Sequence, residues 1–543
     1  MSKLRMNRRK FLKAAACGTI TVAAASCVGN SGLSQSPPKC PVNFLWISCE
    51  DISPDLGCYG DTYAETPNID RLAGQGLRYT NAFVSFPVCA PTRSSIITGV
   101  HPGTLGSMHM RTKNKGYQAV PPAEVKCFTE YLRGAGYYCT NKSKTDYQFA
   151  VPFTAWDESG KKAHWRNRPA NMPFFSVINL TTTHESRCWP RKGEKIVHDP
   201  AKVEVPPYYP DTPIVRENLA RYYDNITKMD KQVGDILAQL EEDGLADSTV
   251  VFFWSDHGRG LPRCKRWPYD SGLHVPLIIR WPDKIKRASV RDDLVNLIDL
   301  APTLLSLAQI KIPSYMQGKV LLGPNMDTPR KYVFGGRNRM DASSNEYIRT
   351  VRDKRYRYIR NFAPQIERSQ RIDYMEKMPI MQQWRLFHKQ GKLNEIQSLF
   401  FQHPKPSEEL YDIPNDPHEV NNLAGSPGHE HLLIRMRTEL AKWIKDTGDL
   451  GGLDEEELIN RMWPGRKQPA TASPVFDTTT LGDGSLLVKI TCPTKGASIG
   501  YRVNPQGRWI VYTKPILLTP DINLQAKAIR IGYSESEMVQ IKH

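Results

Sequence analysis

The sequence predicts an α/β fold with a mainly parallel sheet flanked by helices, a smaller antiparallel subdomain and a C-terminal β module. Three observations carry this prediction. Short apolar runs, polar clusters and helical periodicity alternate through the first part of the chain. After residue 330 the pattern changes to short strands rich in Tyr, Val and Arg, and after a Pro/Gly-rich break at 464–474 it alternates as in an all-β unit. The predicted units are 1–38 (leader and tether), 39–330 (main α/β unit), 331–463 (smaller subdomain) and 474–543 (β module).

The main unit contains three clear strand candidates, at 43–48, 174–178 and 250–254. Each is a short apolar run followed at once by polar residues. Between the second and third, apolar residues recur every three or four positions from 219 to 240, which predicts one amphipathic helix. Strands that alternate with such helices indicate a parallel sheet covered on both faces, where ligands bind beyond the carboxyl ends of the strands.

The charge balance favours an anionic partner. The chain of 543 residues has a formal net charge of +17, and about +11 would remain without the six basic residues of the leader. Charge alone does not choose between a nucleic acid and a sulfated polysaccharide. The basic residues are scattered among acidic ones and form no recognisable nucleic-acid module, so nucleic acid is not an expected partner.

The N-terminus has the pattern of an export signal. Arg8 and Arg9 precede a short apolar stretch, as in substrates of the twin-arginine translocase, and the stretch is too short for a stable membrane span. Ala25 and Ser26 before Cys27 are similar to a lipoprotein cleavage site. We therefore expect an exported protein of the periplasm or cell surface, with Cys27 as a candidate lipid anchor.

The chain has 11 cysteines, of which eight remain when Cys17, Cys27 and Cys89 are set aside. An exported protein permits disulfides, but no spacing here forms a compact disulfide framework or a CxxC metal knuckle. Most of these cysteines are expected to be buried small apolar residues.

The segment 89–99 is the most informative part of the sequence. Pro91 suits the first turn of a helix, so Cys89 is expected at or just before a helix N-terminus, where backbone N–H groups favour negative charge. Arg93 follows one turn later on the same face. An isolated cysteine at a helix start is more often a buried structural residue, but this arrangement also suits an anion-facing nucleophile.

The whole string, Cys-Ala-Pro-Thr-Arg followed by Thr98 and Gly99, resembles the signature of the formylglycine-dependent sulfatases, which have an alkaline-phosphatase-like fold. The match is closest in look to the bacterial polysaccharide sulfatases similar to sulfamidase. The resemblance implies that a formylglycine-generating or anaerobic sulfatase-maturating enzyme converts Cys89 to formylglycine (3-oxoalanine). It also implies that one hydroxyl of the hydrated aldehyde attacks sulfur and that the second lets sulfate leave by elimination.

The resemblance gives roles to the polar residues that follow the strands. Glu50 and Asp51 after the first strand, and Asp256 and His257 after the third, resemble the metal-binding set of the family together with Cys89. Carboxylate oxygens suit one Ca²⁺ ion. Glu50 and His257 depart from the commoner Asp and Asn, so His257 is also a candidate to bind the nucleophile or a sulfate oxygen. Each acidic pair, taken singly, is more often a solvated loop or cap.

Three further residues are expected to act on the sulfate or on the leaving group. Lys265 matches the lysine of a Lys-x-x-x-Tyr-Glu-Gly segment that contacts sulfate in the family. His184, after the second strand, is the candidate general acid. Lys144 corresponds to the lysine of Gly-Lys-x-His, but Asp146 replaces the histidine, which puts one proton-transfer role in doubt.

The leading interpretation is therefore a sulfatase that acts on a sulfated oligosaccharide or polysaccharide and removes either an O-sulfate ester or the N-sulfate of a glucosamine. His109, Arg111, Asp146 and Arg187 are candidates for substrate contacts, since arginine forks match planar anions, although each is equally compatible with ordinary surface charge. Two alternatives remain. One is a phosphoester or phosphonate-ester hydrolase of the same superfamily, and the other is a carbohydrate-binding protein that has lost catalysis.

Overall fold

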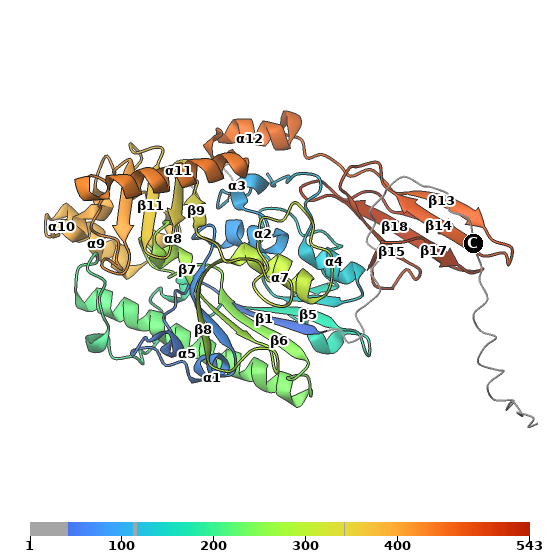
Figure 1. Cartoon of the computed structure of the whole chain (residues 1–543), viewed down its shortest axis with the longest axis horizontal. Coiled ribbons are helices and arrows are strands. Elements are labelled where there is room, and N and C mark those ends of the chain that lie inside the picture. Colours follow the sequence, from blue (N-terminus) through green and yellow to red (C-terminus); the bar gives the residue numbers. More distant parts are fainter. Residues whose placement is uncertain (1–41, 112–116, 342) are drawn as a thin grey trace, which may run out of the picture.

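The computed structural model describes residues 42–111, 117–341 and 343–543. The predicted leader and tether, with Arg8, Arg9 and Cys27, lie outside these residues. Figure 1 shows a large α/β body, with a second sheet on one side and an elongated β module projecting from the other. No helix in the described ranges combines the length and the apolar character that crossing a bilayer requires.

A central sheet of eight strands organises the main unit, in the order β4-β3-β5-β1-β6-β7-β2-β8. Neighbouring strands are parallel except where β7 runs antiparallel to β6 and β2. The bounds are β1 Asn43–Cys49, β2 Leu77–Phe83, β3 Tyr138–Lys142, β4 Glu158–Ser159, β5 Phe174–Leu180, β6 Thr249–Ser255, β7 His274–Arg280 and β8 Ser289–Asn296.

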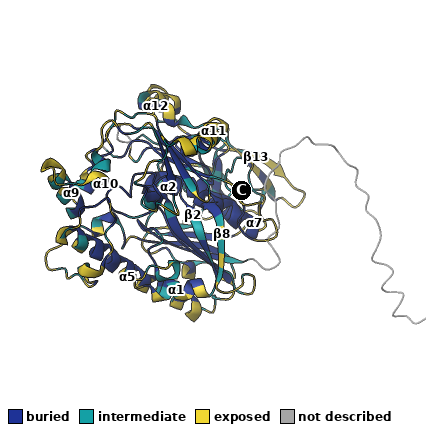
Figure 2. Cartoon of the chain, turned by 60° about the vertical axis from the view of Figure 1, so that its left-hand side comes forward, coloured by how far each residue is buried: buried dark blue, intermediate teal, exposed yellow. Residues whose placement is uncertain are grey.

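Helices cover both faces of this sheet, and alternate residues of β1 enter two different cores. Leu45 and Ile47 pack with the side of α1 and α5, whereas Phe44 and Trp46 pack with the side of α2, α4 and α7 (Figure 1). This period of two is expected for a strand with both faces buried, and Figure 2 shows the strands in the buried class. The helices are α1 Pro67–Gly74, α2 Cys89–Thr98, α3 Pro102–Leu105, α4 Phe128–Gly134, α5 Pro213–Glu242, α6 Asp270–Leu273 and α7 Leu300–Leu307.

The strand directions bring distant segments to one edge of the sheet. Cys49 at the end of β1 is in register with Leu180 of β5 and with Ser255 of β6. Because β7 is antiparallel to β6, the connection 256–273 begins and ends at this same edge. The strand β2 runs with β6, so α2, which begins soon after Phe83, also starts there.

The second unit is a four-stranded antiparallel sheet in the order β12-β11-β10-β9, covered by α11 through a core that includes Leu433, Met436 and Leu440. Its strands are β9 Val333–Arg337, β10 Ile348–Arg352, β11 Tyr356–Asn361 and β12 Glu408–Asp412. The remaining helices are α8 Asp373–Glu376, α9 Pro379–Lys389, α10 Glu395–Ser398, α11 Glu430–Asp446 and α12 Glu455–Met462.

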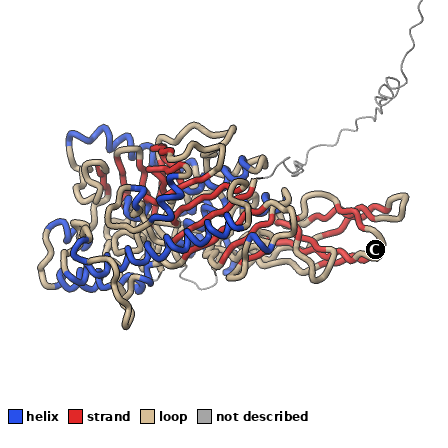
Figure 3. Tube along the Cα trace, turned by 90° about the horizontal axis from the view of Figure 1, so that it is seen from below, coloured by secondary structure: helices blue, strands red, loops and turns tan. Residues whose placement is uncertain are grey.

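The C-terminal module consists of two small antiparallel sheets, β13-β14-β17 and β16-β15-β18-β19 (Figure 3). It contacts the main unit through the ion pair of Arg508 with Asp157 at 2.9 Å. Its strands are β13 Val475–Thr480, β14 Leu486–Thr491, β15 Ser498–Arg502, β16 Ile510–Val511, β17 Ile516–Leu518, β18 Asn523–Ile529 and β19 Val539–Lys542.

The predicted fold class is confirmed: a mainly parallel sheet, a smaller antiparallel sheet and a C-terminal β module are all present. The exact unit boundaries stay predictions. The predicted helix at 219–240 extends further, because Thr212 caps its N-terminus and Pro213 occupies the first turn. The eight described cysteines are all free, and six of them are buried.

Candidate active site

Cys89 is the first residue of α2 and lies 1% exposed at the converging strand ends. The preceding Val88 has an extended backbone, so the helix begins directly at the thiol. The Sγ atom lies 3.3 Å from Nε2 of His257. The free N–H groups of a helix N-terminus stabilise negative charge at such a position.

Arg93, one turn further along α2, is buried and held from two sides. Its Nε donates to Oδ2 of Asp256 at 2.9 Å, and its Nη1 donates to Oδ1 of Asn179 at 2.7 Å. Its Nη2 lies 3.7 Å from Glu50 and has no hydrogen-bond partner among the described residues. Burial alone would lower the pKa of Arg93, but Asp256 and Glu50 raise it above its usual value. The guanidinium therefore stays charged and keeps one buried donor free.

Four predicted residues form a compact group that could hold a metal ion. Ligand atoms of Asp51, Cys89, Asp256 and His257 all lie within 4.8 Å of one another, and all four residues are buried. Asp51 has a left-handed backbone with φ of 61°, and its N–H donates to Oδ1 of Asp256 at 3.2 Å. This turn directs Asp51 toward the end of β6, and positive φ at a residue other than Gly commonly marks a functional position.

The carboxylates of this group are held in the charged form. Burial would raise the pKa of Asp51, but Lys265 and His257 hold it well below its usual range. His257 shows the complementary effect: burial lowers its pKa, yet Asp256 and Asp51 raise it to about 10. The group is thus an alternation of buried positive and negative charges.

Glu50 points to a different neighbour. Its carboxylate forms an ion pair with Nζ of Lys144, which also lies 3.4 Å from Asp146. Glu50 is not among the residues grouped as metal ligands. Its predicted role in metal binding stays a prediction, and its described contacts are with Lys144 and Arg93.

Lys265 enters the same centre from the connection after β6. Its Nζ donates to Oδ2 of Asp51 at 2.8 Å and lies 3.0 Å from Oε1 of Glu185. Glu185 also accepts two hydrogen bonds from Arg266, at 2.8 and 2.6 Å. Burial would raise the pKa of Glu185, but Arg266 and Lys265 lower it to about 2. One buried carboxylate therefore balances two buried cations.

His184 begins the short 3-10 helix Glu185–Arg187 just after β5. Its ligand atom lies with those of Asp51 and Glu185 in a second group within 4.8 Å, and its Nδ1 faces Oγ of Ser186 at 2.8 Å. Burial and the charge of Lys265 lower the pKa of His184 below its usual value. The imidazole therefore caps this short helix, with the backbone N–H of Ser186 donating to its Nδ1 at 3.3 Å, and it also adjoins the charged centre.

The four predicted substrate residues occupy different environments. Arg111 is half exposed and pairs with Asp146 at 2.9 Å, so it is linked to the centre through Lys144. Arg187 is exposed, and its side chain makes no hydrogen bond or ion pair within the described part of the chain. His109 is buried with both ring nitrogens unpaired among described residues, and burial with Arg339 lowers its pKa to about 3. The structure therefore gives His109 no described contact with the centre.

Sequence reasoning did not include Asn179, Glu185 or Arg266. Asn179 lies within β5, one residue beyond the predicted strand end, and a buried amide in an apolar run was an available signal. Glu185 directly follows His184, but only the fold shows that it faces Lys265 and Arg266.

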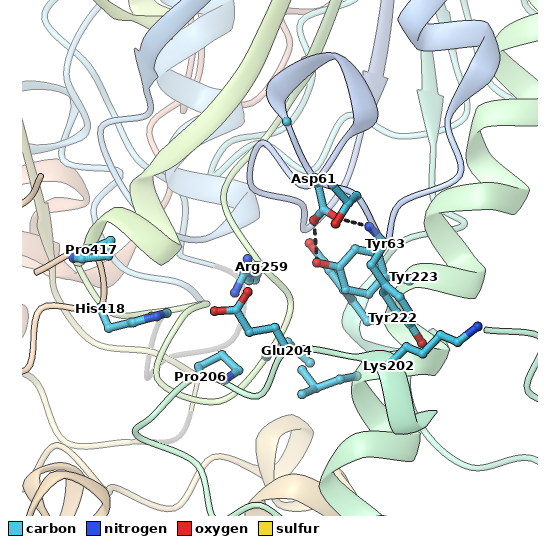
Figure 4. Close-up of a pocket in the computed structure, with 14 residues that line it drawn as sticks. Asp61, Tyr63, Lys202, Glu204, Pro206, Tyr222, Tyr223, Arg259, Pro417 and His418 are labelled. Atoms are coloured by element: carbon cyan, nitrogen blue, oxygen red, sulfur yellow. Dashed lines mark hydrogen bonds between the residues drawn. The ribbon is translucent and has the colours of Figure 1, made fainter. Parts of the chain in front are cut away.

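A separate pocket of about 440 Å³ lies beside the segment after β6 (Figure 4). Its walls include Tyr63, Tyr223, Arg259 and His418, and none of the predicted site residues lines it. Its polar groups are largely satisfied internally: Arg259 pairs with Asp55, and Tyr223 donates to Asp61 at 2.7 Å. We assign no role to this pocket.

Comparison with known proteins gives the family. A family model described as sulfatase matches residues 42–155 and 158–310, and one described as N-sulphoglucosamine sulphohydrolase, C-terminal, matches 263–403. An ulvan-active sulfatase of Formosa agariphila is 40% identical, over 94% of this chain and 93% of that protein. Human N-sulphoglucosamine sulphohydrolase is 27% identical, over 80% of this chain and 96% of that protein.

A solved structure of a 2-O GAG sulfatase superposes with a TM-score of 0.56 at 19% identity, covering 75% of this chain and 93% of that one. At this identity the likeness concerns the fold. The 40% identity to the ulvan-active sulfatase, over nearly the whole length of both chains, supports assignment to the family as well as to the fold. The chain therefore belongs to the sulfatase family and is a sulfuric ester hydrolase.

Proposed function

We propose that this protein removes sulfate from a sulfated carbohydrate, with formylglycine at position 89 as the nucleophile and one Ca²⁺ ion at the adjoining carboxylates. The observation that carries the proposal is the place of Cys89. It lies at the N-terminus of a buried helix, within one group that contains Asp51, Asp256 and His257. A cysteine with a purely structural role would not need three ionisable neighbours in a buried site.

The residues around position 89 suit a tetrahedral anion. Arg93 has a buried donor without a hydrogen bond, and Lys265 and Lys144 bring further positive charge. Fixed cations and N–H donors in a buried site stabilise charge that develops during transfer of a sulfuryl group. The hydrated aldehyde would supply the attacking hydroxyl, which an unmodified thiol does not have.

The donor set fits calcium. Asp51 and Asp256 supply buried carboxylate oxygens, which are hard ligands of the kind that Ca²⁺ prefers. Bound there, the ion would add positive charge beside position 89. Asp51 and Asp256 would hold it, and Arg93 and Lys265, which already contact these carboxylates, would keep them oriented.

His184 is the proposed proton donor to the leaving sugar oxygen. It adjoins Asp51 and Glu185 and is less buried than the rest of the centre. A side chain in this position can reach both the scissile group and the outside of the site. Arg111, Asp146 and Arg187 are proposed to contact the sugar, because Arg111 and Arg187 are exposed and Asp146 forms an ion pair with Arg111.

The carbohydrate assignment rests on the relatives. The ulvan-active sulfatase and the human N-sulphoglucosamine sulphohydrolase are named for sulfated sugars. We further propose export through the twin-arginine translocase and maturation by a formylglycine-forming enzyme, which the paired arginines and the Cys89 segment support.

Two measurements test the proposal. Mass spectrometry of the peptide that contains Cys89, taken from active protein, should detect the aldehyde or its hydrate. Turnover of an aryl sulfate should exceed that of the matching aryl phosphate, and desulfation should be seen with at least one polysaccharide among ulvan, heparin, chondroitin sulfate and carrageenan. An unaltered thiol in fully active protein would contradict the mechanism.

A further inference from the structure

A cluster of two aromatic rings and one lysine lies beside His184. The Tyr374 ring is 6.2 Å from the His184 ring, nearly perpendicular to it, and 5.3 Å from the Trp189 ring. Nζ of Lys377 lies 4.8 Å from the centre of the Trp189 ring and 5.6 Å from that of Tyr374. We call Trp189, Tyr374 and Lys377 the aromatic platform.

The platform is built from two distant segments that meet at the proposed proton donor. Trp189 follows the 3-10 helix that starts after His184, whereas Tyr374 belongs to α8 of the second unit and Lys377 follows directly (Figure 1). No local sequence pattern brings these residues together, because the two segments are far apart in the chain. Their meeting point is therefore a property of the fold, at the side of the centre from which a leaving group departs.

Both segments are anchored. The carbonyl of Cys188, next to Trp189, accepts a hydrogen bond of 2.7 Å from Asn218 of α5. Glu376 of α8 accepts from Nε of Arg385 at 2.8 Å, and Arg385 also donates to the carbonyl of Ser369 at 2.7 Å. Rings that are fixed before binding lose little conformational freedom on contact with a ligand.

The platform also faces outward and carries uncompensated positive charge. Tyr374 is 43% exposed. Lys377 is exposed and forms no ion pair with a carboxylate of the described residues, and the same holds for Arg187, two residues before Trp189 in the chain. An exposed tyrosine ring offers an apolar face, and a lysine without an acidic partner offers charge to an anion.

From this arrangement we infer that the aromatic platform is a binding subsite for the sugar next to the desulfated one. The apolar face of a pyranose ring would lie on Tyr374, and Lys377 with Arg187 would pair with a carboxylate or second sulfate on that ring. This inference rests on the proposed function and names the form of its substrate: an anionic oligosaccharide of at least two sugars.

The alternative explanation is that Lys377 only packs over aromatic rings and binds no ligand. The chain contains another lysine over an aromatic ring that can serve as a matched control. Lys392 follows the end of α9, and its Nζ lies 5.8 Å from the centre of the ring of Phe387 within that helix. None of the described contacts of Lys392 is with a site residue. Lys392→Met therefore removes a comparable lysine from the same unit. It serves as the control for Lys377→Met.

The experiment compares an oligosaccharide with a minimal substrate. Lys377→Met, Tyr374→Ala and Lys392→Met are assayed with an aryl sulfate and with the preferred sulfated tetrasaccharide from ulvan, heparin or chondroitin sulfate. We expect the two platform variants to lose about tenfold in kcat/KM on the tetrasaccharide beyond any loss on the aryl sulfate, mainly through KM. Lys392→Met should show no such difference.

Binding is measured separately, by calorimetry on Cys89→Ala protein with the same tetrasaccharides, so that the outcome does not depend on turnover. Weaker binding in the Cys89→Ala protein when Lys377→Met or Tyr374→Ala is added supports the subsite. Equal losses on both substrates, unchanged binding, or no tetrasaccharide bound at all would overturn it. Failure of the proposed function looks different: the parent enzyme would then prefer aryl phosphate or release no sulfate from any polysaccharide.

Discussion

Oδ1 of Asn179 accepts a 2.7 Å hydrogen bond from Nη1 of Arg93, and the same oxygen accepts from Oγ of Ser48 at 2.7 Å. The amide nitrogen of Asn179 donates in turn to Asn141 at 3.0 Å. Arg93 is therefore oriented by Asp256 at one nitrogen and by a buried amide network at another. Asn179 acts as a positioning residue that fixes the direction of the guanidinium.

Asn179→Ala should lower kcat by about tenfold with a smaller change in KM, because Arg93 would keep its charge but lose a fixed orientation. Ser48→Ala removes another partner of the same oxygen and should affect kcat less. Steady-state kinetics with an aryl sulfate gives both values, and thermal unfolding checks that both variants are folded. Equal losses of kcat in the two variants would argue for a general packing effect.

Glu185→Gln should destabilise the protein by about 3 to 5 kcal/mol, because it leaves Lys265 and Arg266 as buried cations without their shared counter-charge. Glu457→Gln is the control. It breaks an exposed pair with Arg461, one turn apart on α12, and should cost about 0.5 kcal/mol or less. Urea unfolding at neutral pH measures both. A similar small cost for the two variants would mean that Arg266 and Lys265 find other partners.

The sequence allowed three strands of the main sheet, and the place of Cys89 at a helix N-terminus, to be predicted, because these features depend on local patterns. Apolar runs marked β1, β5 and β6, and polar residues directly after them had to meet once the strands were parallel. Contacts that depend on side-chain direction could not be predicted. Glu50 precedes Asp51, yet its carboxylate pairs with Lys144.

The same reasoning explains the other residues that were missed. Glu185 and Arg266 are ordinary charged residues in the sequence, and their pairing spans 81 positions. The antiparallel direction of β7 within the mainly parallel sheet also has no local signal in the sequence. It nevertheless keeps Lys265 at the site edge, because a parallel β7 would have required a crossover to the opposite end of the sheet.

Calcium should raise the midpoint of thermal unfolding relative to protein in chelator, since a ligand that binds the folded state stabilises it. Asp51→Asn and Asp256→Asn should abolish this increase. Glu50→Gln distinguishes two possibilities: we expect the increase to persist, because the Glu50 carboxylate is paired with Lys144. For each variant, the measurement is the difference between the midpoints of thermal unfolding with calcium and with chelator. Persistence of the increase in Asp256→Asn would contradict the assigned site.

Stability should also fall in acid because of the buried histidine His101. It is 5% exposed, faces Oγ of Ser85 at 3.1 Å, and lies against the edge of Trp443. Burial, together with the positive charge of Arg330 and Arg349, lowers its pKa to about 3, although Asp449 opposes this effect. The folded state therefore holds the neutral ring well below the usual pKa of histidine.

Below about pH 6.5 the unfolded chain binds one proton more than the folded protein at this position, so stability decreases as the pH falls from 6.5 toward 3. At pH 5 this proton uptake lowers the free energy of unfolding by about 2 kcal/mol relative to neutral pH. His101→Gln, which keeps a side chain able to bond Ser85, should lose less free energy of unfolding between pH 7 and pH 5 than the parent. His431→Gln, at an exposed position on α11, should behave like the parent. If all three proteins lose the same free energy over this interval, His101 is not the group that titrates.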